Sequence, residues 1–103
     1  MTITLAHYLV LGALLFCLGI YGAISRRNAI GILMALELVF NAVAITFVAA
    51  GRWRPSGAPV GQLAALFVVA AAAAESVLGL AIVLAIYRRR LVVNADDMDL
   101  MKN

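Results

Sequence analysis

The sequence predicts an all-α integral membrane protein with three transmembrane helices. Of its 103 residues, 66% are hydrophobic and only 13% are charged, whereas roughly a quarter of the residues of a soluble protein are charged. A soluble domain of this length has too much surface for its volume to bury so many apolar residues. The apolar residues also form three long runs with basic residues at their edges. Lipid is therefore the expected solvent for most of the chain.

The three apolar runs cover residues 3–24, 29–50 and 60–87, and about 20 such residues span the hydrocarbon layer. The first run has no basic segment before it and exceeds the roughly 7–15 residues of a signal-peptide core, so we expect a retained helix. Residues 51–59 hold both prolines, which predicts a loop. Residues 1–103 form one membrane domain, and its polar tail, 88–103, is expected on the membrane surface or against a partner.

The basic residues are placed as membrane boundary markers rather than as a nucleic-acid surface, which would gather them on one soluble face. Six of the eight lie in the loop 25–28 or in the tail, and two lie in the loop 51–59. Because positive charge favours the cytoplasmic side, the N-terminus is expected outside and the C-terminus in the cytoplasm. The basic residues are Arg26, Arg27, Arg52, Arg54, Arg88, Arg89, Arg90 and Lys102.

The single cysteine and the single histidine give no sign of a metal or redox site. Cys17 excludes an internal disulfide and any pair of cysteines with ligand spacing, and in an apolar run it is expected to be a small buried hydrophobe. His7 has no second ligand nearby and is expected near a membrane surface. We expect no catalytic redox group, no metal and no cofactor in this chain.

Two glutamates interrupt the apolar runs, Glu37 in the second and Glu75 in the third. An ionisable side chain at the bilayer centre costs about 2.5–3.5 kcal/mol, so it is expected to face protein or water and to have a function. Desolvation favours the neutral form of such a carboxyl, and a group that changes its protonation state near working pH transfers protons well. Both glutamates are therefore predicted to transfer protons.

Their depths were estimated from the helix rise of about 1.5 Å per residue. Glu37 lies nine residues after Asn28, roughly 13 Å from the cytoplasmic edge, and Glu75 lies thirteen residues before Arg88, roughly 20 Å from that edge. The sequence thus predicts a difference in depth of about 6 Å, which suits two stations of a stepped proton path. No third ligand accompanies either glutamate, which argues against a metal.

Polar neighbours of the glutamates are candidates for supporting roles. Asn41 follows Glu37 by four residues and shares its helix face, where it could hydrogen-bond the carboxyl or a water. Ser76 adds a hydroxyl beside Glu75, and the alanines before it favour close helix packing. Arg26 and Arg27 are topology signals that could also serve the cytoplasmic end of a proton path. The alternative for the glutamates is that they only join helices through hydrogen bonds.

Several short motifs occur in order along the chain. The first loop and second apolar run contain RRNA, which begins at Arg26, and LELVFNA, which begins at Leu36. The third run contains AAAE, GLAIV and YRRR, which begin at Ala72, Gly79 and Tyr87, and the first run contains the segment 15–22. At these motifs, and over nearly its whole length, the chain resembles the subunit K (chain 4L) family of the proton-pumping NADH:quinone oxidoreductase, complex I.

The resemblance implies a membrane-arm subunit beside the quinone-proximal and antiporter-like subunits, in a bacterial plasma membrane or a thylakoid membrane. Glu37 and Glu75 match the family's proton-transfer carboxylates, and Arg26 and Arg27 match its basic cytoplasmic loop. Quinone, iron–sulfur clusters, and either NADH with FMN or ferredoxin would belong to other subunits. Ser76 departs from the family pattern, in which a small apolar residue commonly follows the glutamate.

Three other functions were considered. The small subunit of multisubunit sodium/proton antiporters has similar length and three spans but generally lacks the two membrane glutamates. Small multidrug exporters usually have four spans with the glutamate in the first, and here the first span has none. A purely structural membrane subunit is the remaining alternative, and neutralising both glutamates would separate it from a proton-transfer subunit.

Overall fold

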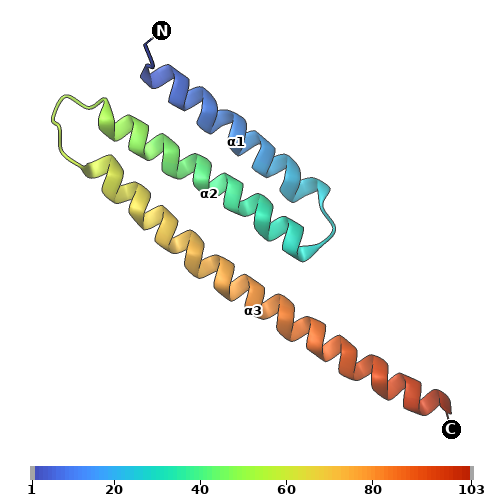
Figure 1. The fold of residues 1–103 in the computed structure, drawn as a ribbon. Coiled ribbons are helices and arrows are strands. Elements are labelled where there is room, and N and C mark those ends of the chain that lie inside the picture. Colours follow the sequence, from blue (N-terminus) through green and yellow to red (C-terminus); the bar gives the residue numbers. More distant parts are fainter. Residues whose placement is uncertain (1, 103) are drawn as a thin grey trace.

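Three helices joined by two short loops make up the structure, a computed structural model that describes the backbone of residues 2–102 and the side chains of residues 2–91. Helix α1 covers Leu5–Ser25, α2 covers Ala29–Arg52 and α3 covers Val60–Lys102 (Figure 1). Each is long and apolar enough to cross a membrane, over Val60–Leu91 in the case of α3. The predicted class, a multi-pass all-α membrane protein, is confirmed.

The ends of the first two helices are capped by the residues beside them. Thr4 precedes α1, and its backbone N–H donates to Nδ1 of His7 at 3.1 Å. The Asn28 side chain accepts a hydrogen bond of 3.0 Å from the backbone N–H of Ile30 at the start of α2. Such caps satisfy backbone groups that a helix end leaves unpaired, so residues 26–28 suffice to reverse the chain.

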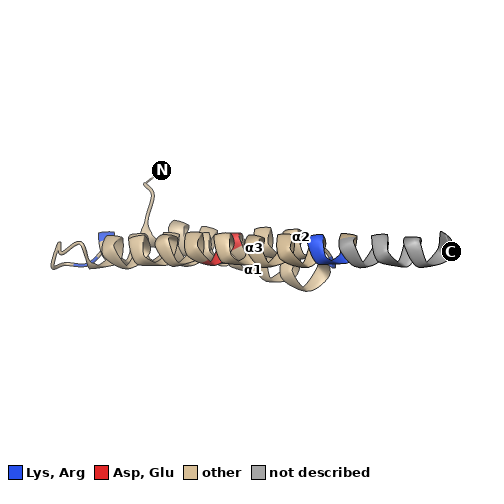
Figure 2. Ribbon diagram, turned by 90° about the horizontal axis from the view of Figure 1, so that it is seen from below, with Lys and Arg blue, Asp and Glu red and all other residues tan. Residues whose placement is uncertain are grey.

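The helices form one flat layer with α2 in the middle. Helix α2 packs against α1 on one side and α3 on the other, and α1 and α3 do not touch within the described residues. The view in Figure 2 looks at the edge of this layer, with the helices nearly in one plane. Each helix therefore exposes two broad faces, and α2 alone has neighbours on both sides.

The contacts between helices are made by glycine and alanine. On α1, Gly12 and Gly19 are buried against α2, which contributes Ala35 and Ala42. These positions repeat every seven residues, the spacing that keeps one side of a helix on its neighbour. Small residues let backbones approach closely, which drives helix association where lipid removes the hydrophobic driving force. Large side chains consequently point outward, and no large side chain of residues 2–91 is fully buried.

Cys17 follows this rule and corrects an expectation. Its side chain is exposed on α1 rather than buried within the chain. The seam with α2 admits only glycine at Gly12 and Gly19, where an added Cβ would lie 2.7 Å and 2.6 Å from the nearest α2 atoms. Cys17 lies two residues before Gly19, about 200° around the helix, so its side chain lies outside this seam.

The close approach of α2 and α3 fixes how they align. A Cβ on Gly61 would lie 2.6 Å from Cα of Gly51, and a Cβ on Gly79 would lie 2.8 Å from the Leu33 side chain. Glu37 is fourteen residues before Gly51, and Glu75 is fourteen after Gly61. Glu37 is also four residues after Leu33, and Glu75 four before Gly79. The antiparallel pairing therefore places Glu75 opposite Glu37, at the same level.

The predicted difference in depth between the glutamates is therefore wrong. It assumed that Asn28 and Arg88 mark the same membrane edge. Asn28 lies five residues before Leu33, and the matching position on α3 lies five after Gly79, at Leu84. Arg88 is four residues further on, which accounts for the whole of the expected difference of about 6 Å.

Two boundaries differ from the expected ones. Helix α2 includes Gly51 and Arg52, which were expected in the loop, because Gly51 packs on Gly61 of α3. The loop then covers residues 53–59 and contains Gly57 at φ +67°, a backbone conformation that glycine adopts without strain. Helix α3 continues beyond Tyr87, where its span was expected to end. The expectation for the tail's surface contacts concerns side chains outside the described residues.

Candidate functional site

Glu37 lies on the side of α2 that faces α3. It precedes Ala44 by seven residues and Gly51 by fourteen, and both of these are buried. The Glu37 side chain is accordingly half-buried. Ser76 of α3 donates a hydrogen bond from Oγ to Oε1 of Glu37. Among the described residues, this is the one side-chain hydrogen bond that joins two helices, so the carboxyl is held in the seam.

Glu75 lies beside this contact but has a different environment. It directly precedes Ser76 in the chain and lies at the same level as Glu37 along the helix axes. Its side chain, however, is exposed on the surface of the layer. Figure 2 shows both glutamates in red near the middle of the layer, away from the blue basic segments. One carboxyl is therefore half-buried between α2 and α3, while the other is exposed at the same level.

Asn41 and Ser76 take different positions from those expected. Asn41 lies one turn after Glu37 but is exposed, and no hydrogen bond joins the two side chains in the part of the chain that the structure describes. Ser76 was expected to support Glu75, its neighbour in sequence, but its hydroxyl serves Glu37. The helix turn explains this, because residues one apart point in directions about 100° apart.

Arg26 and Arg27 lie away from the carboxyls, in the loop between α1 and α2. Both are exposed. The aliphatic stem of Arg26 covers Gly31, where an added Cβ would be 3.4 Å from its Cγ and Cδ. Glu37 lies nine residues after Asn28, so it is roughly 13 Å from this loop along the axis of α2. The arginines therefore mark one end of the layer and make no direct contact with Glu37.

The chemistry available at this site is proton exchange. A carboxyl and a hydroxyl in hydrogen-bond contact both accept and donate protons, and apolar side chains surround them. Within residues 2–91, no three histidine, cysteine, aspartate or glutamate side chains come together as a metal site would require. The sequence did contain a signal for the Glu37 environment, because Glu37, Ala44 and Gly51 share a seven-residue spacing.

The comparisons place the chain among known proteins. The model of the family NADH-ubiquinone/plastoquinone oxidoreductase chain 4L matches residues 7–103. The NADH-quinone oxidoreductase subunit K of Desulfitobacterium hafniense is 48% identical over 98% of this chain and 96% of its own length. The corresponding subunit of a Geobacillus species is 44% identical over 99% and 98%. The NAD(P)H-quinone oxidoreductase subunit 4L of a Synechococcus species is 47% identical over 95% and 96%.

Proposed function

This chain belongs to the NADH-ubiquinone/plastoquinone oxidoreductase chain 4L family, and we propose that, as a membrane-arm subunit of the quinone oxidoreductase complex, it transfers protons through Glu37 and Glu75. The single observation that carries the proposal is the pair of carboxyls at one level inside apolar helices. Ionisable groups at this depth are retained for function because they are costly. The redox groups belong to other subunits, and this chain is a part of the enzyme that carries none.

The two carboxyls act as an inner and an outer station. Glu37 is seated between α2 and α3, with its Oε1 accepting a hydrogen bond from Ser76. Glu75 is exposed on the layer at the same level, which suits contact with a neighbouring membrane-arm subunit or with water. A proton passing between them moves across α3, parallel to the membrane plane. Movement along the membrane normal then takes place in water or in neighbouring subunits.

Quinone reduction drives this transfer by changing the surroundings of the carboxyls. A ligand or redox state shifts an equilibrium only through a difference in interaction energy between two states. A change at the exposed face of Glu75 is transmitted to Glu37 through Ser76, because Ser76 follows Glu75 directly on α3 and donates a hydrogen bond to Glu37 of α2. Arg26, Arg27 and Asn41 have supporting roles at the loop and at the layer surface.

Neutralising each glutamate in the assembled complex tests the proposal. Glu37→Gln is expected to lower the rate of donor-driven proton transport by about 10²-fold or more, the range for loss of a proton-transfer group, and Glu75→Gln is expected to lower it less. The measurement is proton uptake by inverted membrane vesicles, with quinone reduction and subunit assembly followed in parallel.

Thr46→Val is the matched control. Thr46 also lies on α2, but its hydroxyl bonds the backbone oxygen of Ala42 in its own helix, at 2.8 Å. This variant is expected to transport protons at the normal rate. If both glutamine variants assemble and transport protons as the unaltered chain does, the glutamates are structural and the proposal is wrong.

A further inference from the structure

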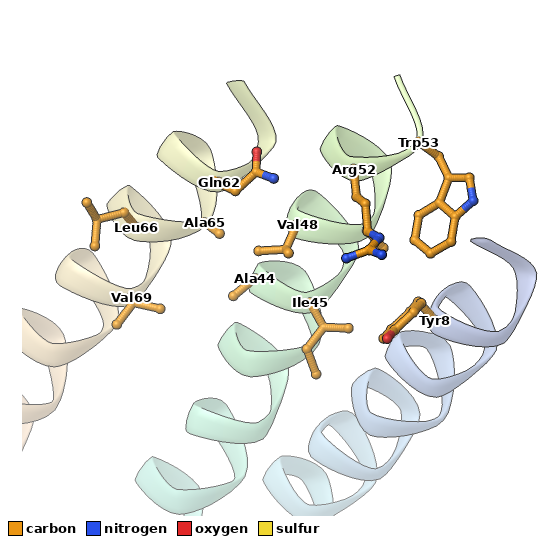
Figure 3. Close-up of a pocket in the computed structure, with 11 residues that line it drawn as sticks. Tyr8, Ala44, Ile45, Val48, Arg52, Trp53, Gln62, Ala65, Leu66 and Val69 are labelled. Atoms are coloured by element: carbon orange, nitrogen blue, oxygen red, sulfur yellow. The ribbon is translucent and has the colours of Figure 1, made fainter. Parts of the chain in front are cut away.

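A groove crosses one face of the layer at the end that carries the loop 53–59. It has a volume of about 480 Å³ and runs over α2, between α3 and Tyr8 of α1 (Figure 3). Ligand-binding grooves are usually of roughly 300–1,000 Å³. This groove is separate from the glutamates, since none of the residues that line it is Glu37, Ser76 or Glu75.

The groove changes from polar to apolar along the helix axes. Arg52, Trp53 and Gln62 lie at its loop end, and Val48 and Leu66 form its walls further in (Figure 3). Arg52 precedes the loop directly, and Ala44, the α2 residue of the groove furthest from the loop, lies eight residues before it, roughly 12 Å along the axis. A phospholipid has this same order of groups, with the headgroup at the membrane surface and the acyl chains inward.

The aromatic side chains place the loop end of the groove at the headgroup level. The rings of Tyr8 and Trp53 lie 5.6 Å apart between centroids, inclined by 52°. The Arg52 guanidinium carbon is 5.5 Å from the centroid of the Trp53 ring, a cation–π distance. Tryptophan and tyrosine are enriched where membrane and water meet. These three side chains therefore form a rigid, positively charged rim.

Among the side chains that the structure describes, no carboxylate lies near the positive charge of this rim. Within residues 2–91 the only carboxylates are Glu37 and Glu75, and Glu37 lies fifteen residues before Arg52, roughly 22 Å away along α2. Arg54 lies in the loop but does not line the groove. A guanidinium is always charged and matches the oxygens of a phosphate. Basic residues near a membrane surface attract anionic lipid, each by about 1 kcal/mol.

We propose that this groove binds an anionic phospholipid. Its phosphate lies at Arg52, beside Trp53, and one acyl chain runs along Val48 and Leu66. A helix of another subunit is the competing occupant. Two features of the groove fit a lipid better than a helix. The groove covers only the part of the α2–α3 contact that is nearest the loop 53–59, and its only charged residue, Arg52, lies at the end expected to hold the headgroup.

The test is photocrosslinking in the assembled complex. Leu66 is replaced by p-benzoylphenylalanine, the purified complex is irradiated, and the mass of the crosslinked product is measured. The expected product is this chain plus one phospholipid, with anionic headgroups about fivefold enriched over the membrane composition, the factor that corresponds to about 1 kcal/mol. The control position is Phe67, which is 79% exposed and does not line the groove, and there no enrichment is expected.

Charge variants identify the headgroup contact. Arg52→Gln, combined with the benzophenone at Leu66, is expected to abolish the enrichment, and Arg52→Lys is expected to retain part of it. Arg54→Gln, outside the groove, is expected to leave it unchanged. A crosslink from Leu66 to another protein subunit would overturn the proposal, as would lipid adducts with the composition of the bulk membrane. Neither result bears on Glu37 or Glu75, so the two proposals fail separately.

Discussion

Glu37 and Ser76 meet where the α2–α3 seam passes the middle of the layer. The hydroxyl donates to the carboxyl from the opposite helix, and the half-buried site restricts water on the seam side. The contact with Ser76 therefore holds the Glu37 carboxyl toward α3.

Removing the Ser76 hydroxyl is expected to slow proton transport about tenfold. This corresponds to about 1.4 kcal/mol, which lies within the range of about 0.5–1.5 kcal/mol for an ordinary hydrogen bond. Ser76→Thr keeps a hydroxyl and is expected to restore most of the rate. In a Glu37→Gln background, Ser76→Ala is expected to add little, because residues in contact do not act additively. A full additional tenfold loss in that background would show that Ser76 acts elsewhere, on Glu75 for instance.

At the scale of the helix, close backbone approach decides the register of the site. Gly51 and Gly61 bring α2 and α3 together at the loop end. On the other side of the glutamates, the Leu33 side chain packs on Gly79. These two contacts fix the alignment that brings Glu37 to Ser76. The packing of small residues therefore positions the candidate site, although these residues carry no ionisable side chain.

Gly61→Ala is expected to disrupt this alignment. A Cβ there would lie 2.2 Å from the backbone oxygen of Phe47, and backbone cannot move aside as a side-chain end can. Overpacking of this kind costs about 1–3 kcal/mol, so the thermal unfolding midpoint in detergent and the yield of assembled complex should both fall.

Gly31→Ala is the matched control for that variant. A Cβ at Gly31 would meet only the flexible Arg26 side chain, at 3.4 Å, and alanine favours a helix over glycine by about 1 kcal/mol. This variant is expected to be as stable as the unaltered chain or slightly more so. Equal loss of stability in both variants would mean that the seam does not depend on a bare backbone at Gly61.

The whole molecule is a flat layer that cannot enclose its own polar groups. The central helix has neighbours on two sides only, so both faces of the layer meet lipid or other subunits (Figures 1 and 2). Glu75 is exposed on this surface, whereas Glu37 is half-buried in a seam. An ionisable group facing lipid is costly, so the completed site needs a neighbouring subunit or water at Glu75.

Replacing each glutamate by leucine in the chain reconstituted alone is expected to have opposite effects. Glu75→Leu removes a carboxyl from a lipid-facing surface and should stabilise the chain, by up to about 2.5–3.5 kcal/mol. Glu37→Leu leaves the Ser76 hydroxyl without its partner in the seam and should destabilise it, by about 1–3 kcal/mol. The measurement is equilibrium unfolding in lipid bicelles. Destabilisation by both changes would indicate that Glu75 is enclosed by the chain itself.

Composition and spacing alone determined the membrane class, the three helices and the two carboxyls as candidate proton carriers. Lipid disfavours unpaired polar and charged groups, so membrane helices appear in the sequence as long hydrophobic runs, and a charged residue within such a run stands out. Sequence also predicted Ser76 and Asn41 as polar neighbours, since each lies within one turn of a glutamate.

Only the tertiary structure decided the depth of the glutamates and the partner of Ser76. The depths counted from Asn28 and Arg88 were wrong because Arg88 lies beyond the level of Asn28. No local sequence pattern specifies the axial offset between two packed helices. That offset is set by long-range backbone contact between glycines, Gly51 with Gly61. The result is a half-buried carboxyl at Glu37 and an exposed carboxyl at Glu75, at the same level of the layer of helices.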